Sequence, residues 1–202
     1  MTTLKKILFV ALLVGLVPAC GNKSEEIENF NEPRFTSEDP IELNVNKIEV
    51  VSEFSQTYKR PNVEHLFPIS IEKTAKTWAA DRLKAVDFSS DKKAVYIIKN
   101  ASVTETLEIS DKAFTKDRVK YKATLNVVLR VHDARQLSSA QTEIEAWREL
   151  TIPADTPLAE KEKYWNGMVY KLFDEFNARM EQNIRQYLNM YVKDNKVIKE
   201  YN

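Results

Sequence analysis

The chain of 202 residues is poor in three residue types that carry chemistry, with one cysteine, three glycines and two histidines. So few glycines cannot build the glycine-rich loops that hold phosphates in P-loop and Rossmann proteins. The Gly-x-Ser-x-Gly motif of serine hydrolases and the His-Glu-x-x-His motif of zinc proteases are also absent. We therefore expect a protein that is not an enzyme, with no catalytic residue, no metal ligand and no cofactor.

Neither sign of charge predominates in the chain. It contains 30 Lys+Arg and 30 Asp+Glu, so its formal net charge is zero. A protein that binds nucleic acid usually carries a basic surface and has a high pI. The composition therefore argues against nucleic acid as a partner.

The one cysteine, Cys20, directly follows a segment typical of a secretory signal. Two lysines precede an apolar run from Ile7 to Val17, and Ala19 places a small residue just before the cysteine. This run of about 11–13 residues is shorter than the roughly 20 that a helix needs to span a bilayer. We predict a signal peptide over residues 1–19 that is cleaved before Cys20.

The residues around this cleavage point resemble the lipobox of bacterial lipoproteins. Val17 occupies its apolar position, Ala19 its small position and Cys20 its cysteine position. Pro18 is unusual in the middle position, but it favours an extended, cleavable segment over an uncleaved membrane anchor. The resemblance implies a diacylglycerol on the Cys20 sulfur and a further acyl chain, such as palmitate, on the freed amine. Such chains hold a protein on a membrane.

The position after the cysteine bears on which membrane carries the protein. An aspartate there would resemble the inner-membrane retention signal of some Gram-negative lipoproteins, and this chain has Gly21 instead. The resemblance therefore implies a protein of the cell envelope that faces the periplasm, with the outer membrane favoured over the inner membrane.

Composition divides the rest of the chain into three parts. Residues 20–40 begin with the lipidated cysteine, are polar and show no period, which is typical of a flexible tether. Residues 41–192 have the patterns of one folded domain. Residues 193–202 are a polar tail, which we expect to be frayed.

The first half of the domain predicts a strand, a loop and a helix. Residues 41–51 alternate between apolar and polar, and a shift of parity indicates a bulge near Asn46-Lys47 or a strand covered on both faces. Ser70 is a plausible N-cap. From there an apolar face with helical spacing continues to Val86.

The second half predicts three strands and a long helix. The strands have one apolar and one polar face, which is typical of an antiparallel meander. The helix begins at Pro157, capped by Asp155 or Thr156, and continues to Tyr191, either unbroken or interrupted at Asn166-Gly167. Its apolar stripe consists of Trp165, Met168, Val169, Leu172, Phe173, Phe176, Met180, Ile184, Tyr187, Leu188 and Tyr191.

The order strand, helix, three strands, helix defines the expected fold class. A β-α-β crossover is right-handed, so the first strand should lie parallel to a strand of the meander. We expect an α+β domain that forms a two-layer α/β sandwich. Its mixed four-stranded sheet would carry both helices on one face.

The alternation of the meander strands also predicts their register. The predicted pairs are Leu107 with Tyr121, Val103 with Leu125, Leu125 with Ala146, and Val127 with Ile144. The same register brings Glu105 and Arg148 together on the inward face, where lone charges would be costly.

The outward face of this sheet is polar except for four large side chains, and tryptophan often anchors protein contacts. Trp147 is the most unusual of them, because it lies between Glu145 and Glu149. Packing against Thr124 is the simpler interpretation of its position. We predict a surface that binds a protein partner, made of Trp147, Tyr96, Ile98 and Val128 with Phe67 from the loop before the first helix.

An alternative function depends on the long loop at residues 52–70. Loops of this length in a compact domain are usually functional or mobile. The loop contains His65, so a periplasmic hydrolase or small-ligand-binding protein is the second hypothesis. A pocket in which His65 faces a carboxylate would favour it.

The lipobox and the order of elements resemble small envelope lipoproteins, namely the lipopolysaccharide-assembly lipoprotein and auxiliary lipoproteins of ABC-type lipid transport. The segments Ile41 to Val51, Ala80-Asp81-Arg82-Leu83 and Phe176 to Leu188 resemble an uncharacterised family of proteobacterial lipoproteins. That family brings no known activity. The resemblance to the small envelope lipoproteins implies a non-catalytic lipoprotein that binds or steadies an envelope protein in envelope assembly or lipid transport.

Overall fold

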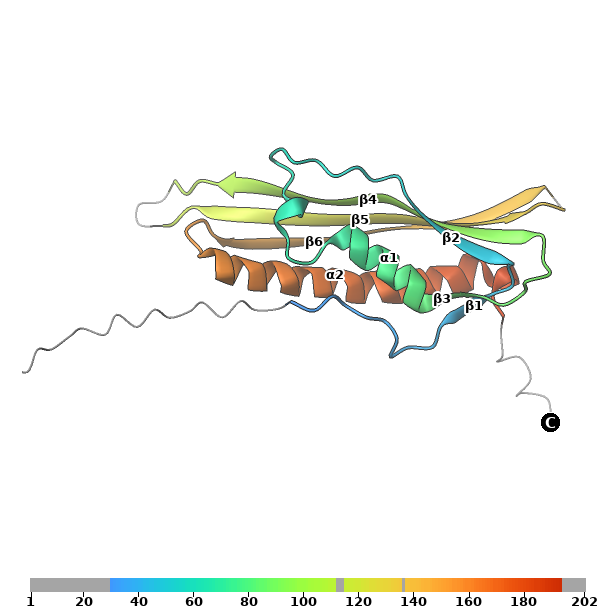
Figure 1. Cartoon of the computed structure of the whole chain (residues 1–202). Helices are drawn as coiled ribbons and strands as arrows, with labels where there is room; N and C mark the ends of the chain where they lie inside the picture. Colours follow the sequence, from blue (N-terminus) through green and yellow to red (C-terminus); the bar gives the residue numbers. More distant parts are fainter. Residues whose placement is uncertain (1–29, 112–114, 136, 194–202) are drawn as a thin grey trace, which may run out of the picture.

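The computed structural model describes residues 30–111, 115–135 and 137–193, which form an α+β domain with a mixed four-stranded sheet, as predicted (Figure 1). The elements are β1 (Ile41–Leu43), β2 (Lys47–Ser52), the 3-10 helix η1 (Glu64–Leu66), α1 (Ile71–Arg82), β3 (Leu83–Ala85), β4 (Lys92–Glu108), β5 (Arg118–Asp133), β6 (Ser138–Pro153), α2 (Leu158–Tyr187) and the 3-10 helix η2 (Asn189–Tyr191). The strand order is β2-β4-β5-β6, and the prediction that the first strand runs parallel to the meander is confirmed by β2 and β4.

Residues 41–52 form two strands that belong to two sheets, so the prediction of a single strand with a bulge over residues 41–51 was wrong. β1 pairs in parallel with β3, whereas β2 pairs with β4. Between them the Val45 amide donates to the Leu43 carbonyl (2.8 Å), and the Asn46 amide donates to the Lys92 carbonyl (2.8 Å). The shift of parity in the sequence therefore marks a change of pairing partner.

The first helix begins as predicted and ends early. The Ser70 side chain accepts a hydrogen bond from the Lys73 amide at 3.2 Å, which caps the helix. The helix ends at Arg82 instead of continuing to Val86, because Leu83–Ala85 pairs with β1 as strand β3. Leu83 is buried in β3 and also fits the apolar spacing of the predicted helix, so its spacing alone did not separate helix from strand.

The predicted register is right for the second hairpin and wrong for the first. Leu125 pairs with Ala146, but Leu107 pairs with Val119 instead of Tyr121. A bulge between Ile98 and Asn100 changes which residues of β4 face inward. The buried residues of β4 are Ala94, Tyr96 and Ile98 before the bulge and Ala101 and Val103 after it, apart from Ile97 on the outer face.

The changed register removes the predicted ion pair between Glu105 and Arg148. Glu105 instead pairs with Arg60 at 3.1 Å. Arg148 lies 3.9 Å from Glu175 of α2. Each charge therefore has a separate partner at the rim of the sheet.

The last helix is continuous through Asn166-Gly167 and ends at Tyr187, where a 3-10 turn follows, so its extension to Tyr191 was wrong. Neither Asp155 nor Thr156 caps it; the N-cap residue is Pro157. The predicted stripe is buried from Trp165 to Ile184, and Tyr187 is exposed.

Aromatic side chains join both helices to the sheet. The Trp78 ring of α1 stacks on Tyr96 of β4 with centroids 5.7 Å apart. The Trp165 ring of α2 meets Tyr121 of β5 edge-on at 5.5 Å. Figure 1 shows α1 and α2 below the four-stranded sheet as drawn. Among the described residues, no helix covers the opposite face of this sheet, which we call the outer face.

Part of the predicted tether belongs to the folded domain. Phe35 is 7% exposed, and its ring lies 5.9 Å from that of Phe173 on α2. Arg34 forms an ion pair of 2.7 Å with Asp81 of α1. A tether extending to residue 40 was therefore wrong, since residues 30–40 contact both helices. The predicted signal peptide and Cys20, together with residues 21–29 and 194–202, lie outside the described residues.

The attachment of residues 30–40 should depend on pH. The hydrogen bonds from Arg34 lower the pKa of the Asp81 carboxyl in the folded protein. A carboxyl with a lowered pKa stabilises the fold above its unfolded pKa of about 4, and this contribution is lost as the pH falls through the folded pKa. We expect hydrogen exchange of the Phe35 amide, corrected for intrinsic rate, to speed up as the pH falls below about 4.

The matched control is Asp155→Asn. The Asp155 carboxyl also has a lowered pKa, because it is hydrogen-bonded to Lys116. It lies before α2, and its ion pair with Lys116 is separate from residues 30–40. Asp81→Asn should flatten the acid dependence of Phe35 exchange, whereas Asp155→Asn should preserve it. Equal effects of the two variants would contradict this assignment.

Candidate binding surface

Three of the five residues predicted to bind a partner are in the core. Tyr96 and Ile98 are fully buried, because the bulge after Ile98 turns them inward. Phe67 is 7% exposed, and its ring stacks on Trp165 at 4.9 Å. Burial raises the pKa of Tyr96 well above its ordinary value, so its hydroxyl stays neutral. These three residues pack the domain and do not form a binding surface.

The other two residues lie on the outer face of the sheet. Val128 pairs with Ile97 across β4 and β5, and both are buried within that face. Trp147 is 52% exposed and lies opposite Thr124, as predicted. The Lys122 ammonium lies 5.5 Å from the centre of the Trp147 ring, a distance that permits a cation–π contact.

Charged side chains surround Trp147 on the outer face. Glu149 forms an ion pair of 2.9 Å with Lys120, and Asn126 donates to the Glu143 carboxylate at 2.8 Å. Glu145 is exposed between Glu143 and Trp147. This face therefore presents a row of charged side chains around one exposed aromatic ring.

The loop at residues 52–70 is held against the edge of β4. The Val63 amide donates to the Val103 carbonyl at 2.8 Å. Glu64 is 7% exposed, and its carboxylate accepts hydrogen bonds from the backbone amides of Thr57 (3.0 Å) and Val103 (3.3 Å). The loop thus continues the edge that β2 starts, which gives its length a structural role.

Among the described residues, no hydrogen bond or ion pair is observed between His65 and a carboxylate. Its Nδ1 is buried without a hydrogen-bond partner, and its ring lies 5.4 Å from that of Tyr58. Across residues 30–111, 115–135 and 137–193, no group of three or more His, Cys, Asp and Glu side chains could hold a metal ion.

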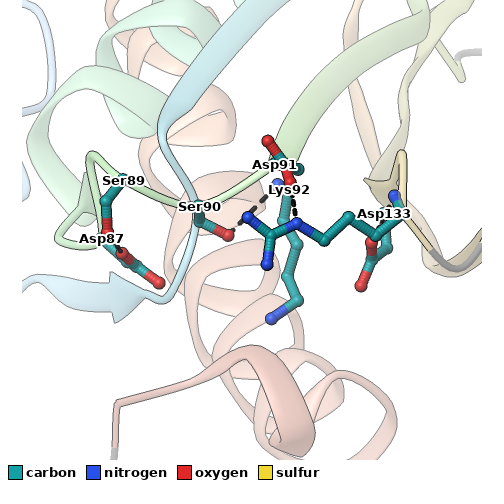
Figure 2. A pocket seen from close by; sticks show the side chains of 7 residues that line it. Asp87, Ser89, Ser90, Asp91, Lys92 and Asp133 are labelled. Carbon is teal, nitrogen blue, oxygen red and sulfur yellow. Dashed lines mark hydrogen bonds and ion pairs between the residues drawn. The ribbon is translucent and has the colours of Figure 1, made fainter.

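A polar hollow of about 320 Å³ lies where the β5–β6 hairpin approaches the start of β4 (Figure 2). It is lined by Asp87, Ser89, Ser90, Asp91, Lys92, Asp133 and Arg135. Arg135 forms an ion pair with Asp91, and its amide donates to the buried Asp133 carboxylate at 3.0 Å. The Arg135 guanidinium is thus paired with a carboxylate, and the Asp133 carboxylate is bonded to a backbone amide, so these groups have structural partners within the hollow. The sequence signal for it was the cluster of Asp and Ser at residues 87–91.

A smaller hollow of about 180 Å³ lies between β6 and α2. It is lined by Arg148, Glu149, Leu150, Lys163, Tyr164, Gly167, Met168 and Lys171. A Cβ atom on Gly167 would meet nothing within 4 Å, so this glycine widens the hollow. Local patterns in the sequence do not reveal this hollow, because its walls come from two elements that are distant in the sequence.

No protein-family model matches the chain, and no curated protein matches it. Among solved structures, a minor lipoprotein from Acinetobacter baumannii is 11% identical and has a TM-score of 0.38, covering 68% of this chain and 94% of that chain. The rare lipoprotein B from Shewanella oneidensis is 16% identical with a TM-score of 0.32, covering 69% and 99%. An uncharacterized lipoprotein B from Nitrosomonas europaea is 18% identical with a TM-score of 0.37, covering 79% and 97%.

All three of these solved structures carry the name lipoprotein. Within the described ranges, no helix is both long and apolar enough to cross a membrane.

Proposed function

We propose that this chain is a lipoprotein of the bacterial envelope, held on a membrane by acyl chains on Cys20. The observation that carries this proposal is the sequence around the one cysteine. It follows an apolar run, a proline and a small residue, where a lipobox has its modified cysteine. The domain faces the periplasm, and the outer membrane is its favoured location.

In this role the domain is a non-catalytic binding or scaffold subunit that steadies a partner in envelope assembly or lipid transport. The sheet supports this role, because its outer face carries Trp147 and no covering helix among the described residues. The alternative is a hydrolase or ligand-binding protein that uses residues 52–70. It is less well supported, because both oxygens of Glu64 bind backbone amides and the His65 ring lies tilted against that of Tyr58.

We expect Cys20→Ala to release the protein from membranes. Without the sulfur no acyl chain is attached, and each lost CH₂ removes about 0.8 kcal/mol of membrane binding. Fractionation of cells should place the wild-type protein in the membrane pellet and most of the variant outside it. Ser24→Ala, a change just beyond the lipobox, is the control and should stay in the pellet. A Cys20→Ala protein that has lost residues 1–19 and still pellets with membranes would contradict the proposed anchor.

The binding role is tested in cells by photo-crosslinking. A photoreactive residue in place of Trp147 should give a discrete crosslinked product with one envelope protein. The same residue in place of Glu53, which lies just beyond β2 at the opposite edge of the sheet, should not give that product. Identical patterns from both positions, or a product from neither, would contradict the outer face as the binding surface.

A further inference from the structure

Strand β6 lies at one edge of the sheet. The directions of the backbone N–H and C=O groups in the neighbouring strands show which residues of β6 direct these groups away from the sheet. Val103 and Glu105 of β4 bond to the segment Pro61–Val63, on the side away from β5. Because neighbouring residues of a strand point their backbone groups in opposite directions, the even-numbered residues of β4 in this region bond to β5. One of these, Thr104, lies opposite Lys122.

The same alternation extends to β6. The even-numbered residues of β5 bond to β4, so the odd-numbered residues, such as Ala123 opposite Arg148, bond to β6. The odd-numbered residues of β6 therefore direct their N–H and C=O groups away from the sheet. One observation agrees: the Arg179 side chain of α2 reaches the Glu145 carbonyl at 3.2 Å.

Beyond Glu145, the backbone groups of Trp147 and Glu149 point to this free edge, and no hydrogen bond to them from that side is observed among the described residues. Their side chains lie on the outer face, as do those of the other odd-numbered residues of β6. A strand added here would form cross-strand pairs with β6 alone, since lysines 120 and 122 are one strand further in. The outer side chains it would meet are Glu145, Trp147 and Glu149.

The inner side chains of an added strand would meet the small hollow between β6 and α2. Leu150 and Met168 contribute apolar lining to this hollow, and Gly167 leaves it open. Arg148, Lys163 and Lys171 also line it, so the side chain that enters it should be apolar and not basic. In strand addition, main-chain hydrogen bonds supply affinity and pockets for alternate side chains supply specificity. The edge and the hollow are adjacent, because Glu149 and Leu150 belong to both.

We propose that Trp147–Leu150 of β6 receives an extended segment of a partner protein as a fifth strand, in which basic side chains alternate with apolar ones. The basic side chains lie against Glu145 and Glu149 on the outer face. An apolar side chain enters the hollow beside Leu150 and Met168. This proposal rests on the proposed binding role and names the chemistry of the partner.

A second copy of this chain is a poorer occupant of the same edge. Two antiparallel copies of β6 related by a two-fold axis near Trp147 would place Glu145 of each copy opposite Glu149 of the other. Like charges directly opposite one another in a sheet are destabilising. The acidic row therefore selects against self-pairing and for a basic strand.

The test uses the full-length acylated protein in detergent with synthetic nine-residue peptides, capped at both ends. One peptide alternates lysine and valine, and the control alternates glutamate and valine. We expect the lysine peptide to bind at least tenfold more tightly. It should also slow hydrogen exchange of the Trp147 and Glu149 amides and leave the exchange of β2 amides unchanged.

Charge-reversal variants separate the edge from general electrostatic attraction. Glu145→Lys with Glu149→Lys should weaken binding of the lysine peptide at least tenfold. The control, Glu49→Lys with Glu53→Lys at the opposite edge of the sheet, makes the same change in net charge and should bind as the wild type does. Glu149→Pro removes one outward amide at an edge position where proline is tolerated, and it should also weaken binding.

Three results would overturn the proposal. They are equal binding of the two peptides, equal loss in the two charge-reversal variants, and amides of Trp147 and Glu149 already protected without peptide. The last would mean that a second copy or another segment of this chain covers the edge. These results leave the crosslink at Trp147 and the acylation of Cys20 untouched, so failure of this inference is distinguishable from failure of the proposed binding role.

Discussion

Replacing Trp78 with alanine should lower the free energy of unfolding by about 3–5 kcal/mol, the usual cost of truncating a fully buried aromatic side chain. Trp78 is 0% exposed and contacts both layers of the domain. Its ring stacks on Tyr96 and meets Phe176 at 5.2 Å, and its indole N–H donates to Asn177 at 2.8 Å. Truncation leaves a cavity and an unpaired amide oxygen where α1, α2 and β4 meet.

Trp147→Ala is the matched control, because it removes the same side chain from the outer face. Trp147 is 52% exposed, and substitutions at such positions usually change stability by no more than about 0.5 kcal/mol. Denaturant unfolding followed by circular dichroism measures both variants. Similar losses in the two variants would contradict the assignment of one tryptophan to the core and the other to the surface.

A loss of about 3 kcal/mol is expected when Glu181 is replaced by alanine, because a buried guanidinium then loses a carboxylate partner. Arg82 is 1% exposed and forms ion pairs with Glu181 of α2 and with Glu38 (3.1 Å). It also donates to the Asp39 carbonyl. Arg82 thereby joins α1 to α2 and to the segment at residues 38–39.

Removing Glu38 together with Glu181 should cost more, about 5 kcal/mol, since the buried charge then has no carboxylate partner. Lys76→Ala is the control. It breaks an exposed pair with Glu72 one turn away on α1, and such pairs contribute about 0.3–0.5 kcal/mol. Thermal and denaturant unfolding measure the three variants. A Glu181→Ala protein as stable as Lys76→Ala would show that Arg82 does not depend on these partners.

Local signals in the sequence predicted much of the fold. Ser70 marked the start of α1, and the clean alternation of β5 and β6 set the register in which Leu125 pairs with Ala146. The parallel pairing of β2 with β4 followed from the handedness of crossovers. Each of these depends on residues close in sequence or on a general rule of chain topology.

The errors arose where pairing partners are distant in sequence. The bulge between Ile98 and Asn100 follows four residues, 95–98, that are apolar or aromatic at both parities, so parity alone could not reveal it. The same bulge moved Tyr96 from the predicted surface to the core. Phe35 lies in a polar stretch, and its role appears only when Phe173 and Asp81 are brought beside it.

The candidate surface could be predicted only in part, because some of its features are local in sequence and others depend on distant elements. Trp147 stood out because it interrupts a row of acidic residues on a strand of clear alternation. The free edge and the hollow beside it could not be predicted, because the hollow needs α2 placed under β6. The sequence alone does not state which strand of a meander is at the edge when another segment can pair with it.

The central claim of this account is that acyl chains on Cys20 anchor the domain to a membrane. Mass spectrometry of the protein purified from its native membranes tests it most directly. The account predicts that the first 19 residues are missing and that the amino-terminal peptide, starting at Cys20, carries a diacylglycerol and a further acyl chain. An intact initiator methionine, or an unmodified cysteine at the amino terminus, would contradict the account.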